Sequence, residues 1–212
     1  MRFTKLGHAC VRLEKDGGVL VIDPGAFSGD TALDGADAVL VTHEHFDHVV
    51  PDSLRAALAG NPGLRVWAAA PVAAQFAEFG DRARAVAHGD EFTAAGFAVH
   101  AYGSEHAVIH PDIPTVANVG FLVDGEVFHP GDSYTVPEES AGTLLLPASG
   151  PWHSTSAMID YARAVAPRRG IFIHDALLSE IGLNVLGMFS GLAAGPNGAE
   201  FTLLKPGTSV DL

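Results

Sequence analysis

The sequence predicts an α/β protein in which two mixed β-sheets pack against each other and carry helices on their outer faces. Short stretches rich in β-branched and aromatic residues recur between Gly, Pro and Asp turns, as strands do. "VRLEKDGGVLVIDPG" (11–25) and "VGFLVDGEVFHPGDS" (119–133) share the order strand, Asp-Gly turn, strand and Pro-Gly. A duplicated half-domain would produce this repeat, with chance as the alternative, and two such halves would bury their apolar strands by packing sheet on sheet.

The boundaries of the expected elements follow from turn and capping residues. Strands are predicted over 2–6, 10–14, 18–23, 38–42, 65–69, 96–102, 119–123, 126–130, 143–147, 170–174 and 200–205. Helices are predicted over 51–60, 71–80, 154–167 and 176–190. Pro51 suits a first helical turn, and Gly80 suits a helix end. Either Ser154 or Ser156 caps the third helix, which stops at Pro167.

Composition bounds the size and the partners of the protein. The 212 residues are 48 % hydrophobic and 17 % charged, which is enough apolar material for a single domain over 1–212. The formal net charge of −13 argues against binding a nucleic-acid backbone or an anionic membrane surface. No apolar run approaches the ~18 residues of a membrane span, so we expect no membrane insertion. A small-molecule partner fits this composition, and homo-oligomerisation is left open.

Cysteine usage and the N-terminus predict a cytoplasmic location. Cys10 is the only cysteine, so no disulfide forms within the chain, which suits a reducing compartment. It lies in the apolar stretch "HACVRL", where a small buried hydrophobe is a better interpretation than a nucleophile. The first residues, "MRFTKLGHACVRLE", enter a strand pattern without an apolar leader, so we expect no signal peptide.

The stretch "VLVTHEHFDHVV" (39–50) gathers histidines and an aspartate directly after an apolar strand. Ligands of α/β proteins collect where strands end. His43 and His45 are two residues apart and can point the same way, whereas Asp47 and His48 are poorly placed to share their ion. We therefore expect two neighbouring ions, one at each pair, and a chance His-rich loop is the alternative. Imidazole and carboxylate ligands indicate zinc, iron or manganese.

Three later segments can complete the two half-sites. "AYGSEHAVIHP" offers His106 and its rival His110. "VFHPGDSY" offers Asp132, and "GIFIHDAL" offers His174, again at strand ends. One histidine for each ion and one shared carboxylate give these sets: His43, His45 and His106 on the first ion, Asp47, His48 and His174 on the second, and Asp132 between them. The arrangement leaves a coordination position for water, as a catalytic site requires.

The ligand pattern resembles that of the metallo-β-lactamase superfamily. Its signature H-x-H-x-D-H and its later single His, Asp and His motifs stand here as His43, His45, Asp47, His48, His106, Asp132 and His174. The likeness covers nearly the whole chain. The segments "LGHAC", "VIDPG" and "HPGDS" look most like the metal-dependent hydrolase branch that includes L-ascorbate-6-phosphate lactonase and N-acylphosphatidylethanolamine phospholipase D. The resemblance implies a four-layered αβ/βα sandwich with a dinuclear site at one edge, most often of zinc, with manganese or iron in some members.

Ligands of this kind predict a hydrolase. A hydroxide activated by two divalent metal ions would attack a small ester, lactone, amide or phosphodiester. Asp47 and Asp132 would be ligands first, and either would carry a proton during the reaction. An iron-dependent oxidoreductase of the same fold and a non-catalytic metal-binding scaffold are the alternative functions.

Further residues are expected around the ions. Asp23 and His8 are candidates to contact metal-bound histidines from outside, since such rings usually donate their second N–H to a partner. A turn-capping role for Asp23 and a structural role for His8 are the alternatives. Pocket shape is expected to come from loops at 24–37, 106–118 and 147–156. Within them, His110, Trp152 and His153 are candidate substrate contacts, although Trp152 also suits a packing role.

Overall fold

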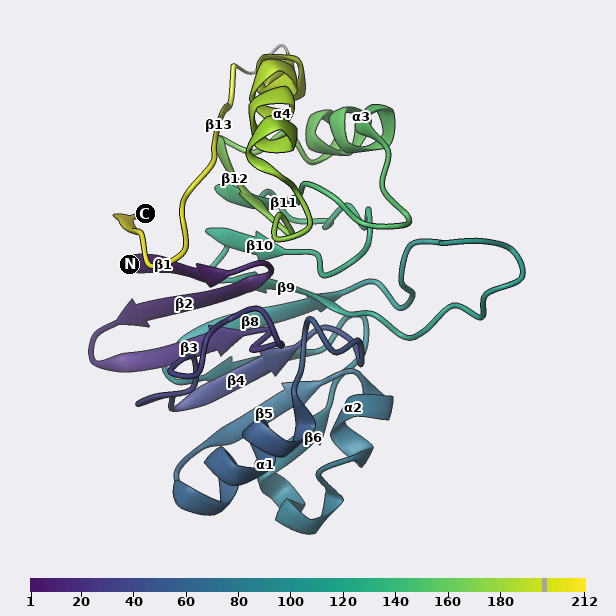
Figure 1. Ribbon diagram of the computed structural model, residues 1–212. Helices are drawn as coiled ribbons and strands as arrows, with labels where there is room; N and C mark the ends of the chain where they lie inside the picture. The colour runs from purple at the N-terminus through teal and green to yellow at the C-terminus, as the bar shows by residue number, and fades with distance from the viewer. Residues whose placement is uncertain (196–197) are drawn as a thin grey trace.

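Two seven-stranded sheets lie face to face in the middle of the molecule (Figure 1). The fold is described from a computed structural model that places residues 1–195 and 198–212. The first sheet contains, in spatial order, β14 (Ser209–Asp211), β1 (Arg2–Gly7), β2 (Cys10–Lys15), β3 (Gly18–Ile22), β4 (Ala38–Val41), β5 (Arg65–Ala68) and β6 (Ala83–Ala85). The second contains β13 (Glu200–Thr202), β12 (Arg169–Ile173), β11 (Thr143–Pro147), β10 (Val127–His129), β9 (Gly120–Val123), β8 (Phe97–Tyr102) and β7 (Glu91–Ala94).

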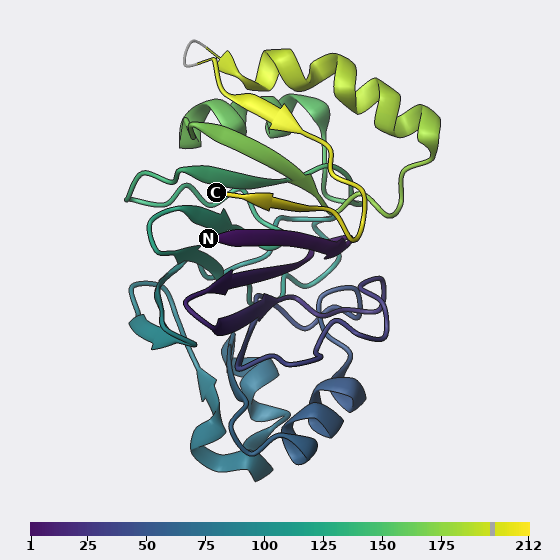
Figure 2. The ribbon, with the colours of Figure 1, turned by 90° about the vertical axis from the view of Figure 1, so that its left-hand side faces the viewer.

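The two sheets repeat one pairing pattern. In the first, neighbours from β1 to β3 are antiparallel and neighbours from β3 to β6 are parallel. In the second, neighbours from β8 to β10 are antiparallel and neighbours from β10 to β13 are parallel. An antiparallel edge strand completes each sheet, β14 beside β1 and β7 beside β8, so the two chain ends lie side by side (Figure 2). The repeat in the sequence thus corresponds to two half-domains of the same topology.

Glycine-containing two-residue turns close the hairpins of both halves. Asp16 and Gly17 have φ values of 51° and 86°, and Asp124 and Gly125 have φ values of 51° and 63°. Positive φ at both central residues defines the type I′ turn, whose twist matches that of the paired strands. The Asp-Gly turns in the sequence therefore form the hairpins β2–β3 and β9–β10, as predicted.

Helices cover the outer face of each sheet (Figures 1 and 2). The first sheet carries α1 (Pro51–Gly60), α2 (Ala70–Ala74) and the 3₁₀ helix η1 (Ala77–Arg82), and the second carries α3 (Thr155–Val165) and α4 (Glu180–Ala193). One apolar cluster fills the space between the sheets, and a further cluster lies under the helices of each half. The layers therefore run helix, sheet, sheet, helix, and the predicted four-layered sandwich is confirmed.

Several element predictions were wrong at their boundaries. The expected helix 71–80 divides, because Phe76 leaves helical geometry (φ −120°, ψ 22°) and buries its ring under the first sheet. The last helix begins at Glu180 rather than at 176, behind the N-cap Ser179, and the strand expected over 200–205 ends at Thr202. The short strands β6, β7 and β14 were not predicted.

Other expectations have a clear outcome in the fold. Ser154, rather than Ser156, caps α3 by accepting a hydrogen bond from the Ala157 N–H. Cys10 is buried in the cluster under the first sheet, and burial raises the pKa of its thiol, as befits a packing residue. In the part of the chain that the structure describes, no helix has the length and apolar character needed to cross a membrane.

Candidate metal centre

Strand ends from both sheets converge at one edge of the sandwich. The loop 42–50 follows β4, and shorter segments of the centre follow β8, β10 and β12. The turn between β1 and β2 adds His8. Because parallel strands end at the same edge of their sheet, these segments meet although they are far apart in the sequence.

Two groups of side chains at this edge have the composition and spacing of metal ligands. The first consists of His43, His45, His106 and Asp132, and the second consists of His8, Asp47, His48 and His174. Within each group, one donor atom per residue lies within 4.8 Å of the others. The structure thus brings together all the residues predicted as ligands and adds His8 to them. His110, the rival of His106, is exposed and lies outside both groups.

Asp132 lies between the two groups. Its Oδ2 atom is 3.3 Å from Nε2 of His106 and 3.1 Å from Nε2 of His174. Its Oδ1 atom is 3.1 Å from Nε2 of His48. The side chain of Asn118 accepts a hydrogen bond from the Asp132 N–H, and Trp152 donates its Nε1–H to Oδ2 at 3.1 Å. Asp132 therefore occupies the position that a shared carboxylate needs.

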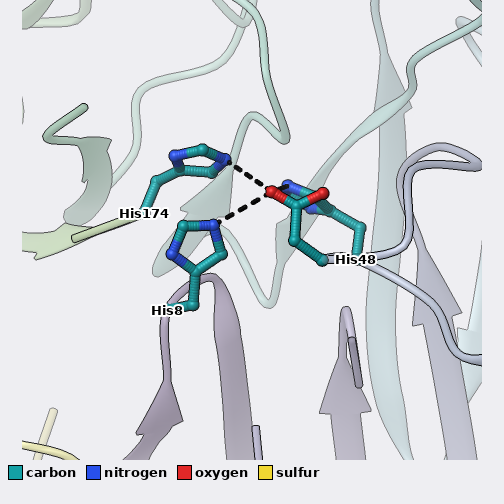
Figure 3. Close-up of side chains that lie close together, drawn as sticks. His8, His48 and His174 are labelled. Atoms are coloured by element: carbon teal, nitrogen blue, oxygen red, sulfur yellow. Dashed lines mark hydrogen bonds and ion pairs between the residues drawn. The ribbon is translucent and has the colours of Figure 1, made fainter. Parts of the chain in front are cut away.

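Asp47 lies at the middle of the second group. Its Oδ2 atom is 3.1 Å from Nε2 of His8, 3.4 Å from Nε2 of His174 and 4.0 Å from Nε2 of His48. Figure 3 shows these three imidazoles converging on one carboxylate from three separate segments of the chain. One carboxylate therefore lies among three imidazole nitrogens.

Hydrogen bonds at the outer ring nitrogens decide which histidines offer a lone pair to a metal. A neutral imidazole carries one proton, so a ring that donates Nδ1–H outward presents an unprotonated Nε2 inward. His48 donates Nδ1–H to Oδ2 of Asp23 at 2.7 Å, and His106 donates Nδ1–H to the Ala107 carbonyl at 2.6 Å. In its neutral form, each of these two rings therefore presents an Nε2 lone pair to the centre.

Thr42 fixes His43 in the same tautomer. The Thr42 hydroxyl donates its one proton to Oδ2 of Asp23 at 2.7 Å, because an ionised carboxylate only accepts. Its contact of 3.0 Å with Nδ1 of His43 must then be a bond donated by the ring. Asp23 also accepts the Thr42 N–H at 2.8 Å. One buried aspartate therefore orients His43 and His48 together, which is the role expected of a residue behind the ligands.

His8 has the opposite tautomer. Its Nδ1 accepts a hydrogen bond from the Ala176 N–H at 3.2 Å, so its proton is on Nε2, which donates to Asp47. Burial lowers the pKa of His8, so the ring stays neutral near pH 7. Metal binding through Nε2 would place two N–H groups, of the ring and of Ala176, against each other. The geometry therefore favours His8 as a donor that holds Asp47, rather than as a further ligand.

Charges at the centre shift the pKa values of its members. Burial would lower the pKa of His48, but Asp132 and Asp23 outweigh it and raise this pKa well above its usual value. Burial also opposes protonation of His174, yet Asp132 and Asp47 raise its pKa overall. Burial would raise the pKa of Asp132, but the histidines around it hold this pKa well below its usual range. The centre therefore attracts protons or cations.

Several buried atoms at the centre have no hydrogen-bond partner. They include Nε2 of His48, His106 and His174 and Oδ1 of Asp132. Buried polar atoms are normally paired, because an unpaired one costs about 1–3 kcal/mol. A divalent cation would satisfy these atoms, and imidazole with carboxylate is the donor set that suits zinc, iron or manganese. The residues present therefore fit a metal site.

The backbone around the centre is strained and tightly held. His8, Asp23 and His174 have φ values of 50°, 53° and 56°, a left-handed conformation that costs residues with a side chain about 1–3 kcal/mol. The His174 N–H donates to the His8 carbonyl at 3.0 Å, and the Ser149 hydroxyl donates to the His174 carbonyl at 2.5 Å. These bonds fix the position of His174 at the end of β12.

Lys5 is a part of this edge that the sequence did not reveal. Its fully buried side chain donates to the Phe172 carbonyl at 3.0 Å and to Oδ2 of Asp175 at 2.6 Å. Burial lowers the pKa of Lys5, although Asp175 opposes that shift. The ammonium group ties β1 of the first sheet to the end of β12 in the second, next to His174. In the sequence, Lys5 looks like an ordinary polar residue of an alternating strand.

A cavity of about 300 Å³ opens over the metal centre. Asp47, Asp132 and Trp152 are part of its wall, with other members of both ligand groups. The predicted pocket loops contribute Phe27, Ile109 and Pro151, whereas Phe46 and Leu177 were not predicted. The three candidate substrate contacts lie in different places. Trp152 lines this cavity, His153 lines a neighbouring one, and His110 is exposed in its loop.

The fold and the ligand groups together define a known class of protein. Residues 2–174 match the family described as beta-lactamase superfamily domain. The chain therefore belongs to this superfamily.

Individual relatives agree with that assignment. The Mycobacterium tuberculosis protein Rv0786c is 37 % identical over 216 aligned positions, which cover 99 % of each chain. An Aeropyrum pernix protein named UPF0173 metal-dependent hydrolase is 29 % identical over 77 % of this chain and 76 % of its own. Among solved structures, Igni18 of Ignicoccus hospitalis, described as a metallo hydrolase, has a TM-score of 0.75 at 18 % identity, covering 99 % of this chain and 97 % of its own. This last likeness shows the fold.

Proposed function

We propose that this protein hydrolyses a small ester, lactone, amide or phosphodiester with the help of two divalent metal ions, zinc above all. Its broader class is a metal-dependent hydrolase of the metallo-β-lactamase superfamily, in line with its family, its His and Asp groups and the hydrolases among its relatives. The observation that carries the proposal is the convergence of unpaired, buried Nε2 atoms on Asp132. Manganese or iron would suit the same donors.

His43, His45 and His106 would hold one ion, Asp47, His48 and His174 the other, and Asp132 both. When bound, such ions lower the pKa of water to about 7 and polarise the attacked oxygen. The chain's own groups orient these ligands: Asp23 and Thr42 fix the ring protons of His43 and His48, and His8 holds Asp47.

Asp47 is better placed than Asp132 to carry a proton during the reaction. Its side chain is 15 % exposed and lines the cavity, whereas that of Asp132 is 3 % exposed and engaged by Trp152 and histidines. A carboxylate that meets the cavity can exchange a proton with the leaving group or with water.

The partner would be a small molecule, since the cavity is small and the net charge of −13 repels nucleic acid and anionic lipid. We also propose that the protein does not insert into a membrane. The cytoplasmic location remains a prediction from the single cysteine.

Metal content and turnover test the proposal together. The purified protein should contain close to two equivalents of zinc or manganese and should hydrolyse a chromogenic ester or bis(p-nitrophenyl) phosphate. Bound iron with a visible charge-transfer band and no hydrolysis would favour the oxidoreductase alternative. Tight metal binding without turnover of either substrate would favour a non-catalytic scaffold.

A further inference from the structure

We propose that the substrate is a neutral carboxylic ester or lactone whose acyl part is apolar, and that the apolar side chains around the metal centre bind this part. The inference rests on the proposed hydrolase function and narrows it. It excludes phosphodiesters and other anionic substrates, which the metal ligands alone would allow. Phe27, Phe46, Ile109, Pro151 and Leu177 carry the argument, and we name them the apolar rim.

Most side chains of the apolar rim are exposed to solvent and therefore contribute little to the packing of the fold. Phe46 is 65 % exposed and Leu177 is 59 % exposed, although both flank a strongly polar centre. Phe46 touches Phe27 edge to face, with ring centroids 5.7 Å apart, so the two rings form one continuous surface. Apolar side chains gathered at the mouth of a cavity mark a binding surface more often than a packing defect.

Trp152 makes the inner wall of the cavity rigid. Its indole N–H is committed to Asp132, and its ring meets Tyr134 at 5.2 Å and His106 at 5.9 Å between centroids. An aromatic wall held in this way presents its apolar face to a ligand and leaves no free donor for a charged group. The wall therefore suits a hydrocarbon chain or ring lying beside the reacting carbonyl.

Lysine and arginine side chains are absent from this cavity in the described part of the chain: none of its 12 Lys and Arg residues lines the wall. Lys5 binds Asp175, the residue after His174, but it is not available to a substrate. Its ammonium group is buried and donates to Asp175 and to the Phe172 carbonyl. Proteins bind phosphate and carboxylate groups with Arg, Lys or free backbone N–H groups. Here an anionic substrate would meet only the ions, in competition with the carboxylates of Asp47 and Asp132.

The reaction is a balanced hydrolysis. The oxygen of one water forms a bond to the acyl carbon, and the bond from that carbon to the alcohol oxygen breaks. The alcohol leaves with a proton, and the acyl part leaves as a carboxylate after losing the other proton. No oxidant or further reactant is required.

Chain length and charge of the acyl group test the inference. The zinc-loaded protein would be assayed with p-nitrophenyl acetate, p-nitrophenyl hexanoate, the anionic ester p-nitrophenyl hydrogen glutarate and bis(p-nitrophenyl) phosphate. Each buried methylene is worth about fourfold in binding, so partial burial of the longer chain predicts at least about a tenfold gain in kcat/KM over the acetate. The anionic ester and the phosphodiester should both be poorer than the hexanoate by at least about tenfold.

Matched variants locate the effect. Leu177→Ser removes an exposed member of the apolar rim and should reduce the hexanoate-to-acetate ratio severalfold. Leu177→Arg should also improve the glutarate ester relative to the hexanoate. Met188→Ser is the control, because Met188 is also an exposed apolar residue, on α4, but does not line the cavity; it should leave both ratios unchanged. Equal rates on acetate and hexanoate, or a preference for an anionic substrate, would overturn the inference while leaving the hydrolase function intact.

A binding measurement separates the two claims. If none of the substrates turns over with zinc, manganese or iron, the proposed hydrolase function fails. The inference is then decided by quenching of the intrinsic tryptophan fluorescence with hexanohydroxamate and acetohydroxamate, because Trp152 lines the cavity. Tighter binding of the longer hydroxamate by about tenfold supports an apolar acyl site, and equal binding contradicts it.

Discussion

Thr42 and Asp23 determine which nitrogen of His43 faces the metal centre. The same aspartate sets the proton of His48, so a residue outside the ligand set decides the ligand properties of two rings. His8 and His129 have the opposite tautomer. In His129, Nδ1 accepts the Gly131 N–H and Nε2 donates to the Ala9 carbonyl. Histidines of the candidate metal centre thus differ in role according to what their outer nitrogen contacts.

Asp23→Asn tests this control of the tautomer. The amide of the variant has one acceptor oxygen and one NH2 group, whereas both carboxylate oxygens of Asp23 accept. The NH2 group would face the donors of Thr42 or the Nδ1–H of His48, and two donors repel each other. We expect zinc affinity to fall by about 10- to 100-fold, as for other residues that orient ligands, measured by competition with a chromogenic chelator. Asp37→Asn is the matched control, since Asp37 is exposed, lies away from the centre and accepts the Val19 N–H with its carboxylate at 3.0 Å. Equal affinities of the two variants would contradict the account.

Metal binding should release protons. The pKa values of His48 and His174 are raised in the metal-free centre, so these rings hold protons near neutral pH that a metal must displace. Zinc affinity should therefore increase as pH rises through and above the usual histidine range. Calorimetric titration in two buffers of different ionisation enthalpy would reveal the released protons as a buffer-dependent heat. A heat independent of the buffer would show that the rings are already deprotonated.

At the scale of elements, the loop after β4 depends on the loop after β3. Gly25 approaches the Asp47 carbonyl so closely that an added Cβ would be 1.9 Å from its oxygen. The Ala26 N–H also donates to the Phe46 carbonyl at 2.9 Å. The Pro-Gly pair after β3 therefore sets the position of the whole H-x-H-x-D-H loop.

Gly25→Ala should displace this loop. The clash is with backbone atoms, which cannot move aside cheaply, so we expect a loss of about 2 kcal/mol or more in the free energy of unfolding together with reduced zinc content. Gly60→Ala serves as the control, because a Cβ there meets nothing within 4 Å and the position is helical. It should be neutral or stabilising by less than about 1 kcal/mol. Denaturant unfolding and metal analysis of both variants would decide; an unperturbed Gly25→Ala protein would refute the dependence.

The sequence predicted elements well where burial imposes a pattern and poorly where it does not. The strands β4 and β11 are buried along their full length and stood out as apolar runs. The missed strands β6, β7 and β14 are three or four residues long and exposed or half-buried over most of their length, so no hydrophobic period marks them. The hairpin β7–β8 turns at Ala95 and Gly96, with φ values of 51° and 83°, and lacks the Asp or Asn that signals such a turn.

At the scale of the whole molecule, the ligands and two residues behind them, Asp23 and His8, could be listed from the sequence, but the contacts that hold them and the role of Lys5 could not. The ligand types and their order are visible in one dimension. The contact of His8 with Asp47 joins residues 39 positions apart, and that of Lys5 with Asp175 joins residues 170 positions apart. The His8–Asp47 pair forms only when the strands of the first sheet have assembled, and the Lys5–Asp175 pair forms only when the two sheets have packed. In the sequence, Lys5 does not differ from a surface residue of a strand.

Because both sheets contribute ligands, bound metal should stabilise the entire fold. Zinc at 100 times its dissociation constant would add about 2.7 kcal/mol to the free energy of unfolding. This gain corresponds to a rise in Tm of roughly 5–10 °C for a chain of this size. A chelator should reverse the shift in a thermal melt. Asp132→Asn should abolish it, since Asp132 contacts both ligand groups, whereas Asp112→Asn, at an exposed position, should retain it.

The most direct measurement is a crystal structure of the zinc-loaded protein with anomalous data at the zinc edge. We predict two peaks at the edge of the sandwich, each about 2.0–2.2 Å from its imidazole and carboxylate atoms, with Asp132 contacting both and His8 contacting neither. Peaks elsewhere on the surface, or a single ion bound without Asp132, would contradict the account.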